Sequence, residues 1–309
     1  MPAPANIATV RVQVDGTWHT LTWNETNQAY EKEISAPTIT SFNKPGGFYA
    51  LVADVTNTAG TTTTVDTTDA TFGNDLKLVV KETIAPVITI TSPANGATVI
   101  NAQMPVLFTV VDELNGSGVN LDTVKVAFGG TTYDVTDGEL TYTSITNGYS
   151  FTFTPASPTS DGSHTATIDA KDNDDNSAIQ KSVTYTVETT LPALNVTAPL
   201  NNAITNQASI NVVGATNPST ARPVTVVIKV GTTDQGAVTV ASDGSFTKGI
   251  TLANGTNTIT ITATDDLGKV STITLTVTLD TSAPEFISID LTPNPVDAGE
   301  TLLISVKVM

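Results

Sequence analysis

The chain has 309 residues, more than one ordinary domain holds, so two or more domains are expected. Its 13 basic and 30 acidic residues give a net charge of -17, which excludes a basic nucleic-acid-binding surface and attraction to anionic membranes. The absence of cysteine excludes disulfides and thiolate metal sites, and two histidines are too few for a zinc site. Threonine supplies 59 residues, and with abundant Val and Ile it predicts an all-β protein.

A short junction recurs three times along the chain, as ETIAP at 82–86, ETTLP at 188–192 and DTSAP at 280–284. The prolines are 106 and 92 residues apart, close to the roughly 100 residues of a two-sheet β-sandwich. Proline lacks a backbone N–H and favours extended geometry before it, which suits a linker that enters an edge strand. We therefore expect three tandem sandwiches, at 1–82, 83–188 and 189–280, and a partial segment of strands at 281–309.

The N-terminal segment is polar by its fifteenth residue, so it carries no visible secretion signal. Trp18 and Trp23 flank His19 in a segment that alternates like a strand. Two interpretations remain open for the tryptophans, an aromatic cluster on a sandwich wall or a platform on which sugar rings stack. Further along, a Thr-rich stretch at 61–71 is interpreted as an insertion between two strands.

The second unit contains an alternating apolar strand that leads into the acidic turn DNDDN at 172–176. Calcium takes six to eight hard oxygen ligands, and closely placed carboxylates supply several of them. Asp172, Asp174 and Asp175 are therefore the candidate calcium ligands, and calcium is the one cofactor considered. The turn is not an EF-hand, because Ser177 stands where that loop needs Gly. The alternative is an ordinary solvated hairpin tip, which Asp and Asn favour.

The third unit shows the strongest strand pattern. Ile259, Ile261 and Ala263 alternate with threonines, the turn at 265–268 follows, and apolar residues alternate again as far as Leu279. This alternation predicts an antiparallel hairpin that is packed on one face only.

After the last junction, strands are predicted from Phe286 to Leu291 and from Thr301 to Val308. So short a segment does not bury enough apolar surface to fold alone, and three accounts remain: the strands add to another chain, fold back on the third unit, or belong to a chain that was cut here. We favour the first account. The expected assembly residues are Phe286, Ile289, Leu302, Ile304 and Val306.

The chain lacks the usual raw material of an active site. Ser163 and His164 are adjacent, but neighbouring side chains on a strand point to opposite faces. The pair Asp112-Glu113 has the residue types of glycoside hydrolysis, yet acids occur in loops throughout this chain. Neither a GxSxG motif nor a phosphate-binding loop is present. We therefore expect no enzymatic activity.

The segments ITITSPANGATV at 88–99, HTATIDAKDNDDNSA at 164–178 and TNTITITATDDLGKVS at 256–271 make nearly the whole chain resemble bacterial immunoglobulin-like repeat proteins. In addition, DGTWHTLTW at 15–23 and LTPNPVDAGETLLISV at 291–306 resemble Ig-repeat proteins of tailed phages and prophages of Gram-positive gut bacteria.

This resemblance implies tandem immunoglobulin-like sandwiches in a non-enzymatic virion protein, associated with the tail or another exposed surface and with an adhesive or structural role. The alternative is a fragment of a bacterial cell-surface adhesin or stalk, for which stiffening by calcium is the option considered. The expected partners are other virion or surface proteins and host-surface glycans in an oligomeric assembly, with no nucleic acid and no membrane insertion.

Overall fold

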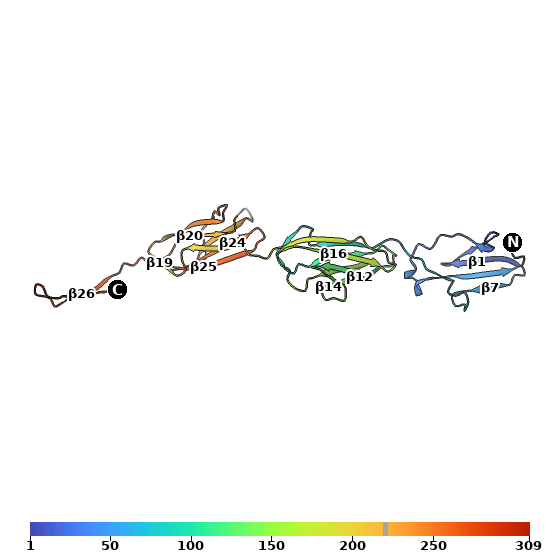
Figure 1. Ribbon diagram of the computed structural model, residues 1–309, viewed down its shortest axis with the longest axis horizontal. Coiled ribbons are helices and arrows are strands. Elements are labelled where there is room, and N and C mark those ends of the chain that lie inside the picture. Colours follow the sequence, from blue (N-terminus) through green and yellow to red (C-terminus); the bar gives the residue numbers. More distant parts are fainter. Residues whose placement is uncertain (219–221) are drawn as a thin grey trace. The chain divides into compact units, whose positions relative to one another are not determined.

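The computed structural model describes residues 1–218 and 222–309. The chain forms two compact units, Met1–Glu188 and Thr189–Met309. Within the described residues, strands make up the regular structure apart from two single 3₁₀ turns, η1 (Ser41–Asn43) and η2 (Pro45–Gly47). The predicted all-β class is confirmed, and the strands form tandem immunoglobulin-like sandwiches (Figure 1).

Residues 1–82, here called the first domain, contain a four-stranded sheet of order β2-β1-β6-β7 and two short strand pairs, β3–β4 and β5–β8. The strands are β1 (Ile7–Val14), β2 (Thr17–Thr20), β3 (Thr22–Asn24), β4 (Ala29–Glu31), β5 (Tyr49–Ala50), β6 (Val52–Asn57), β7 (Thr62–Val65) and β8 (Lys77–Leu78). Only two of its described hydrophobic side chains, Val14 and Tyr49, are fully buried. The interpretation of 61–71 as an insertion is wrong for Thr62–Val65, because these residues pair with β6 as the edge strand β7.

Residues 83–188, the second domain, form two facing sheets of order β10-β17-β16-β12-β13 and β14-β15-β11-β9. Their strands are β9 (Val87–Ser92), β10 (Thr98–Val99), β11 (Val106–Val111), β12 (Val119–Phe128), β13 (Thr131–Tyr133), β14 (Leu140–Ile145), β15 (Gly148–Phe153), β16 (Gly162–Asp172) and β17 (Lys181–Val187). The inward side chains of both sheets form one core, in which the rings of Phe108 and Phe151 stack with centroids 4.9 Å apart.

Residues 189–280, the third domain, contain sheets of order β19-β25-β24-β21-β22 and β18-β20-β23. Their strands are β18 (Leu194–Ala198), β19 (Ala203–Thr205), β20 (Ser209–Thr216), β21 (Val224–Val230), β22 (Thr233–Asp234), β23 (Ser245–Thr251), β24 (Gly255–Asp265) and β25 (Val270–Leu279). The predicted hairpin is confirmed as β24–β25, and Ile259, Ile261 and Ala263 are completely buried. In both domains the larger sheet has a short parallel strand at one edge, β10 on β17 and β19 on β25.

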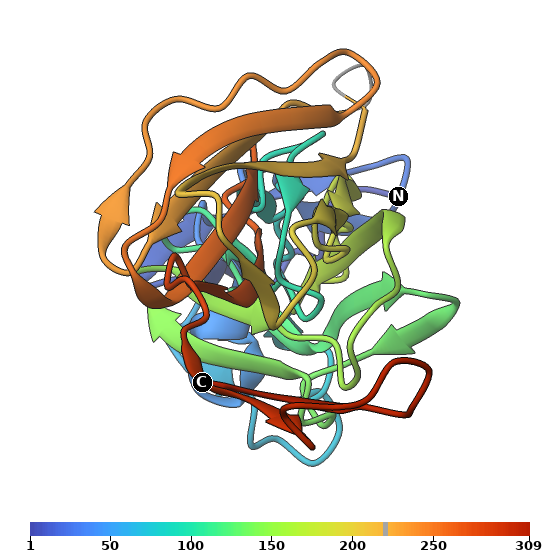
Figure 2. The ribbon, with the colours of Figure 1, turned by 90° about the vertical axis from the view of Figure 1, so that its left-hand side faces the viewer.

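The C-terminal segment is a two-stranded hairpin of β26 (Phe286–Thr292) and β27 (Leu303–Val308), as the sequence predicted. Figure 2 shows it in dark red as two antiparallel strands joined by an open loop. Its cross-strand partners Ile289 and Val306 are 60% and 51% exposed, so the apolar side chains of the hairpin are uncovered within the chain. The other expected assembly residues are exposed as well: Phe286, Leu302 and Ile304.

Candidate cation site between the first two domains

The acidic turn at 172–176 is organised by its first residue. Asp172 is completely buried, and its Oδ1 accepts hydrogen bonds from the backbone N–H of Asp174 at 2.9 Å and of Asn176 at 2.8 Å. Its Oδ2 accepts a third hydrogen bond from Asn176 Nδ2 at 2.7 Å. Asp265 accepts from the backbone N–H groups of Leu267 and Lys269 in the corresponding turn of the third domain. An Asp at the end of this strand therefore shapes the turn by accepting backbone donors, as Asx turns do.

The same turn holds the linker between the first and second domains. Asp174 Oδ2 accepts hydrogen bonds from the backbone N–H of Glu82 at 3.1 Å and from Thr40 Oγ1 at 2.5 Å. Asn176 Nδ2 donates to the carbonyl oxygen of Glu82 at 3.2 Å. In addition, Asn43 Nδ2 of the first domain donates to the carbonyl oxygen of Gly116 at 2.6 Å. Both backbone groups of Glu82 are thus bound by the second domain, and Thr40 and Asn43 join the first domain to it.

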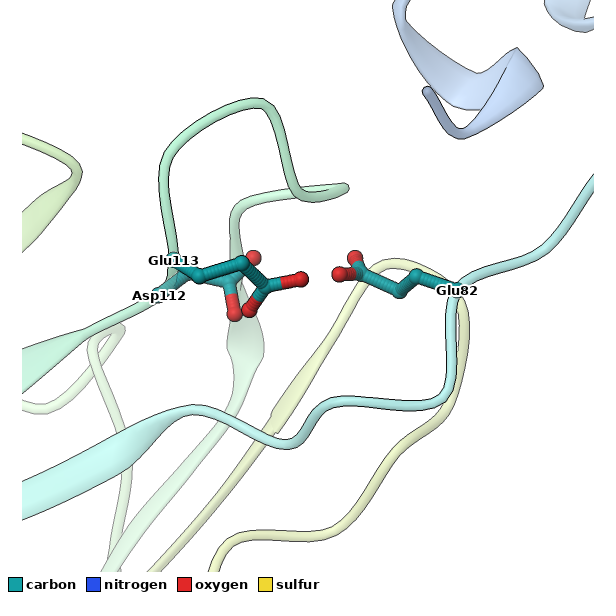
Figure 3. Close-up of side chains that lie close together, drawn as sticks. All are labelled: Glu82, Asp112 and Glu113. Atoms are coloured by element: carbon teal, nitrogen blue, oxygen red, sulfur yellow. The ribbon is translucent and has the colours of Figure 1, made fainter. Parts of the chain in front are cut away.

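This arrangement brings three carboxylates together: Glu82 from the linker, and Asp112 and Glu113 from the loop that directly follows β11 (Figure 3). One oxygen of each lies within 4.8 Å of the other two. Asp112 is only 4% exposed. Glu82 Oε2, Asp112 Oδ1 and Glu113 Oε2 are buried and accept no hydrogen bond from the residues that the structure describes.

The remaining oxygens are held by the backbone of the same loop. The N–H of Ser117 donates to Glu82 Oε1, and the N–H of Gly118 donates to Asp112 Oδ2 at 2.6 Å. Each of these two carboxylates therefore has one fixed oxygen and one free oxygen. Ser117 also accepts, through its Oγ, a hydrogen bond from the N–H of Asp174 at 3.1 Å, which ties the loop to the acidic turn.

The cluster is electrostatically unfavourable without a counterion. Burial raises the pKa of Asp112, and the negative charges of Glu82, Asp172 and Asp174 raise it as well. Together they outweigh the lowering effect of the Gly118 N–H and bring the pKa to about 6. The cluster borders a cleft of about 480 Å³ that Lys44 also lines. The Lys44 ammonium, however, lies 3.4 Å from Asp15 Oδ1 and 4.5 Å from the ring centre of Tyr49.

The predicted calcium ligands take different positions around this joint. Asp172 already accepts three hydrogen bonds, and Asp174 accepts two at one oxygen. Asp175 is exposed, in a left-handed conformation with φ 73°. The carboxylates that have a buried oxygen without a partner are instead those of Glu82, Asp112 and Glu113. Sequence reasoning did not assign these residues to a metal, although Glu82 opens the repeated junction and the other two form the acidic pair noted above.

The two tryptophans have separate environments. Trp18 is 38% exposed, and the Arg11 guanidinium carbon lies 4.3 Å from its ring centre. Trp23 meets Tyr30 edge-on at 5.3 Å, and its Nε1 donates to the carbonyl oxygen of Met1. Glycan binding by Trp18 and Trp23 stays a prediction.

His164 contacts a backbone carbonyl and aromatic rings, as a structural residue does. Its Nε2 is 2.8 Å from the carbonyl oxygen of Ser160, and its ring lies near those of Phe128 and Tyr185.

Comparison with known families supports the immunoglobulin-like character of the chain. Residues 86–168 match the bacterial Ig domain family, and residues 192–281 match the family described as glucodextranase, domain B. The first match falls within the second domain, and the second match falls on the third domain. Bacillopeptidase F of Bacillus subtilis (strain 168) is 38% identical over 107 residues, which are 34% of this chain and 7% of that protein. The chain thus spans only a small part of the curated relative that it matches.

Two solved structures resemble the chain at low identity. The fibronectin(III)-like modules of CbhA from Clostridium thermocellum are 16% identical, with 62% of this chain and 94% of that chain covered and a TM-score of 0.33. A tetra-tandem repeat in the extending region of a large adhesion protein is 15% identical, with 99% and 81% covered and a TM-score of 0.34. Within the described residues, no helix has the length and apolar character that a transmembrane span requires.

Proposed function

We propose that this chain is a non-enzymatic structural or adhesive repeat protein that works outside the cell, on a surface or a particle. The observation that carries the proposal is the fixed joint between the first two domains, in which Thr40 and Glu82 both donate to Asp174. A protein that spaces or presents a binding surface is served by successive domains with a restrained joint, and here hydrogen bonds from the second domain reach both the linker and the first domain.

The absence of catalysis is part of the proposal. Ig-like domains are generally not catalytic, and the names of the matched glucodextranase domain and peptidase describe those proteins. Here Ser163 and His164 belong to strand β16, where His164 is engaged with Ser160 and neighbouring rings. The pair Asp112-Glu113 is gathered with Glu82 at a domain joint. These placements support a structural use of the residues that a hydrolase would need.

The finer proposal is a tail-associated or surface-associated phage virion protein, and the alternative is a segment of a bacterial adhesin or stalk. The resemblance of residues 15–23 and 291–306 to phage Ig-repeat proteins supports the first. Mass spectrometry of purified phage particles and of the washed cell-wall fraction from the same culture separates the two. Peptides of this chain in particles purified through a density gradient support the virion; peptides confined to the wall fraction reject it and support the adhesin.

Adhesion is proposed to occur through surface glycans, with many weak contacts multiplied by copy number. The exposed indole of Trp18 is the first residue to test. The full chain, coupled to beads, is measured for retention of host cells, and Trp18→Ala and Trp23→Ala are compared with Tyr142→Ala, an exposed aromatic of the second domain. Loss of retention in the tryptophan variants alone supports a glycan platform. If the native chain retains no cells, the role is that of a spacer.

A further inference from the structure

We propose that a calcium ion binds at the joint of the first and second domains, with Glu82, Asp112 and Glu113 as its protein ligands. This inference goes beyond a structural or adhesive role, because it assigns a specific ion to carboxylates from the linker and the second domain. It also differs from the sequence prediction, which placed calcium on the acidic turn.

The carboxylate cluster contains buried oxygens without hydrogen-bond partners among the described residues. Nearly all buried polar groups in folded proteins have a partner, and a buried charge is paired or coordinates a metal. Here three adjacent carboxylates each have one buried oxygen without a partner in the described residues, and Asp112 is 96% buried. Three such oxygens that face one another repel, unless a proton or a cation lies between them.

The backbone leaves room for this convergence at one glycine. A Cβ atom on Gly116 would lie 2.7 Å from Asp112 Oδ2 and 2.9 Å from both Glu113 Cδ and Glu82 Oε2. The loop therefore passes so close to all three carboxylates that even a methyl group would displace them. A side chain at this position would occupy the space in which the carboxylates gather.

The donor set selects the ion. All three ligands are carboxylate oxygens, which suit hard cations such as calcium and magnesium rather than zinc. The three oxygens lie within 4.8 Å of one another, slightly wider than the spacing of about 4.0–4.5 Å that three oxygens take around one calcium ion with bonds of about 2.3–2.6 Å, so a small rotation of the glutamate side chains brings all three to one ion. Magnesium demands shorter bonds of about 2.0–2.1 Å in strict octahedral geometry. The adjoining cleft gives access for the water ligands that complete the calcium coordination.

The position of Glu82 makes this ion a tie between domains. Glu82 lies in the linker, whereas Asp112 and Glu113 belong to the second domain. Its backbone N–H shares Asp174 Oδ2 with the hydroxyl of Thr40 from the first domain. Calcium binding therefore restrains the linker at the point where both domains are attached to it.

Calorimetric titration of the full chain with calcium chloride tests the site. We expect saturable binding of one ion, a rise in melting temperature that EDTA reverses, and at least a tenfold weaker affinity in Glu113→Gln and Asp112→Asn. Glu139→Gln is the matched control, because Glu139 lies at the opposite end of the sheet from the site. Its neighbour Leu140 pairs with Phe153 at one end of β15, whereas Val111, next to Asp112, pairs with Gly148 at the other end. Gly116→Ala should weaken binding as well.

The outcomes separate cleanly. The proposal is overturned if calcium shows no saturable binding and no effect on melting temperature. It is also overturned if the triple variant Glu82→Gln, Asp112→Asn, Glu113→Gln keeps the native affinity, because calcium then binds elsewhere. Tighter binding of magnesium than of calcium overturns the choice of ion. If Asp112→Asn does not fold, Glu113→Gln, which alters the less buried carboxylate, still decides. None of these results bears on whether the chain occurs in particles or on cells.

A proteolysis experiment tests the tie itself. Lys81 is exposed and directly precedes Glu82, so endoproteinase Lys-C can cut the linker there. Calcium should slow this cleavage several-fold in the native chain and not in Glu113→Gln, while cleavage at the exposed Lys32 of the first domain stays unchanged in both. Equal rates at Lys81 with and without bound calcium would overturn the role of the ion in restraining the linker.

Discussion

The hydroxyl of Thr40 donates a hydrogen bond to Asp174 Oδ2 at 2.5 Å, although the two residues lie 134 positions apart in the sequence. Thr40 is 3% exposed and precedes the turn η1. Its side-chain oxygen accepts a hydrogen bond from the N–H of Phe42 in that turn. The same carboxylate oxygen accepts the N–H of Glu82 in the linker. One oxygen of the second domain thus fixes a turn of the first domain and the chain between them.

Replacing Thr40 with Val should weaken this joint. The substitution preserves shape but removes the donor, and a hydrogen bond to a charged group contributes about 1.5–3 kcal/mol. Because Trp18 and Trp23 are the only tryptophans, tryptophan fluorescence during urea unfolding reports on the first domain. We expect a lower urea midpoint for Thr40→Val and a nearly native one for Thr63→Val, an exposed threonine on β7. Equal loss in both variants would contradict a special role for Thr40.

The first domain should also lose stability in acid through Asp54. The Thr64 hydroxyl at 2.7 Å lowers the pKa of Asp54 below its usual 3.8, and the Arg11 guanidinium at 2.8 Å lowers it further while burial opposes both. Because the folded-state pKa lies below the unfolded one, this stabilisation is present above pH 3.8 and is lost as the pH falls through the folded-state pKa.

Thr64→Val should therefore lower the urea midpoint at neutral pH by the equivalent of about 1 kcal/mol, since partial exposure of Arg11 screens the site. The difference in urea midpoint between Thr64→Val and the native chain should shrink in acid, where Asp54 is protonated in both chains. Tryptophan fluorescence at the two pH values measures it, with Thr63→Val as the control. A difference that stays constant with pH would show that Thr64 acts through packing and not through the charge of Asp54.

The sequence predicts those elements whose side chains alternate strictly. Ile259 and Ile261 alternate with threonine over a long strand, and a period of two has one structural solution when one face is buried. Thr62–Val65 was missed because threonines on both faces of an edge strand leave no alternation to detect. That strand exists because its backbone pairs with β6, which is a contact between segments rather than a property of either.

The candidate site was only partly predictable for a related reason. The turn at 172–176 is local, so Asp172 and Asp174 could be found from their spacing alone. The cluster of Glu82 with Asp112 depends on where a linker runs across a loop 30 residues away, and no local pattern encodes that. The repeated junction did mark Glu82 as a boundary residue, but it did not show what the residue faces.

In the third domain, Gly214 on β20 is required by close packing. A Cβ atom there would lie 2.4 Å from the carbonyl oxygen of Asn195 and 2.5 Å from Phe246 Cζ, whereas one on Gly249 of β23 would meet only Asn211 Oδ1 at 3.5 Å. We expect Gly214→Ala to destabilise the third domain by about 1–3 kcal/mol, as overpacking of a core does, and Gly249→Ala to be tolerated. Hydrogen exchange of the backbone amides of β24 measures this; equal protection in both variants would contradict it.

The C-terminal hairpin should promote association through one face. Ile289 and Leu291 of β26 pair with Val306 and Ile304 of β27, and because alternate residues share a face, all four side chains lie on the same side. Each is at least 42% exposed, and an exposed apolar strand pair is a surface on which another chain can bind. We expect the native chain to form oligomers in a concentration-dependent manner in sedimentation velocity, and Val306→Asp to shift it toward monomer.

Ser305→Asp is the matched control, because Ser305 directly precedes Val306 on β27 and its side chain lies on the opposite face of the hairpin. It adds the same charge to the same strand and should leave association unchanged. A native chain that sediments as a monomer at every concentration would mean that the face does not pair with a second copy. Loss of oligomers in both variants would mean that negative charge on the hairpin, and not the apolar face, governs assembly.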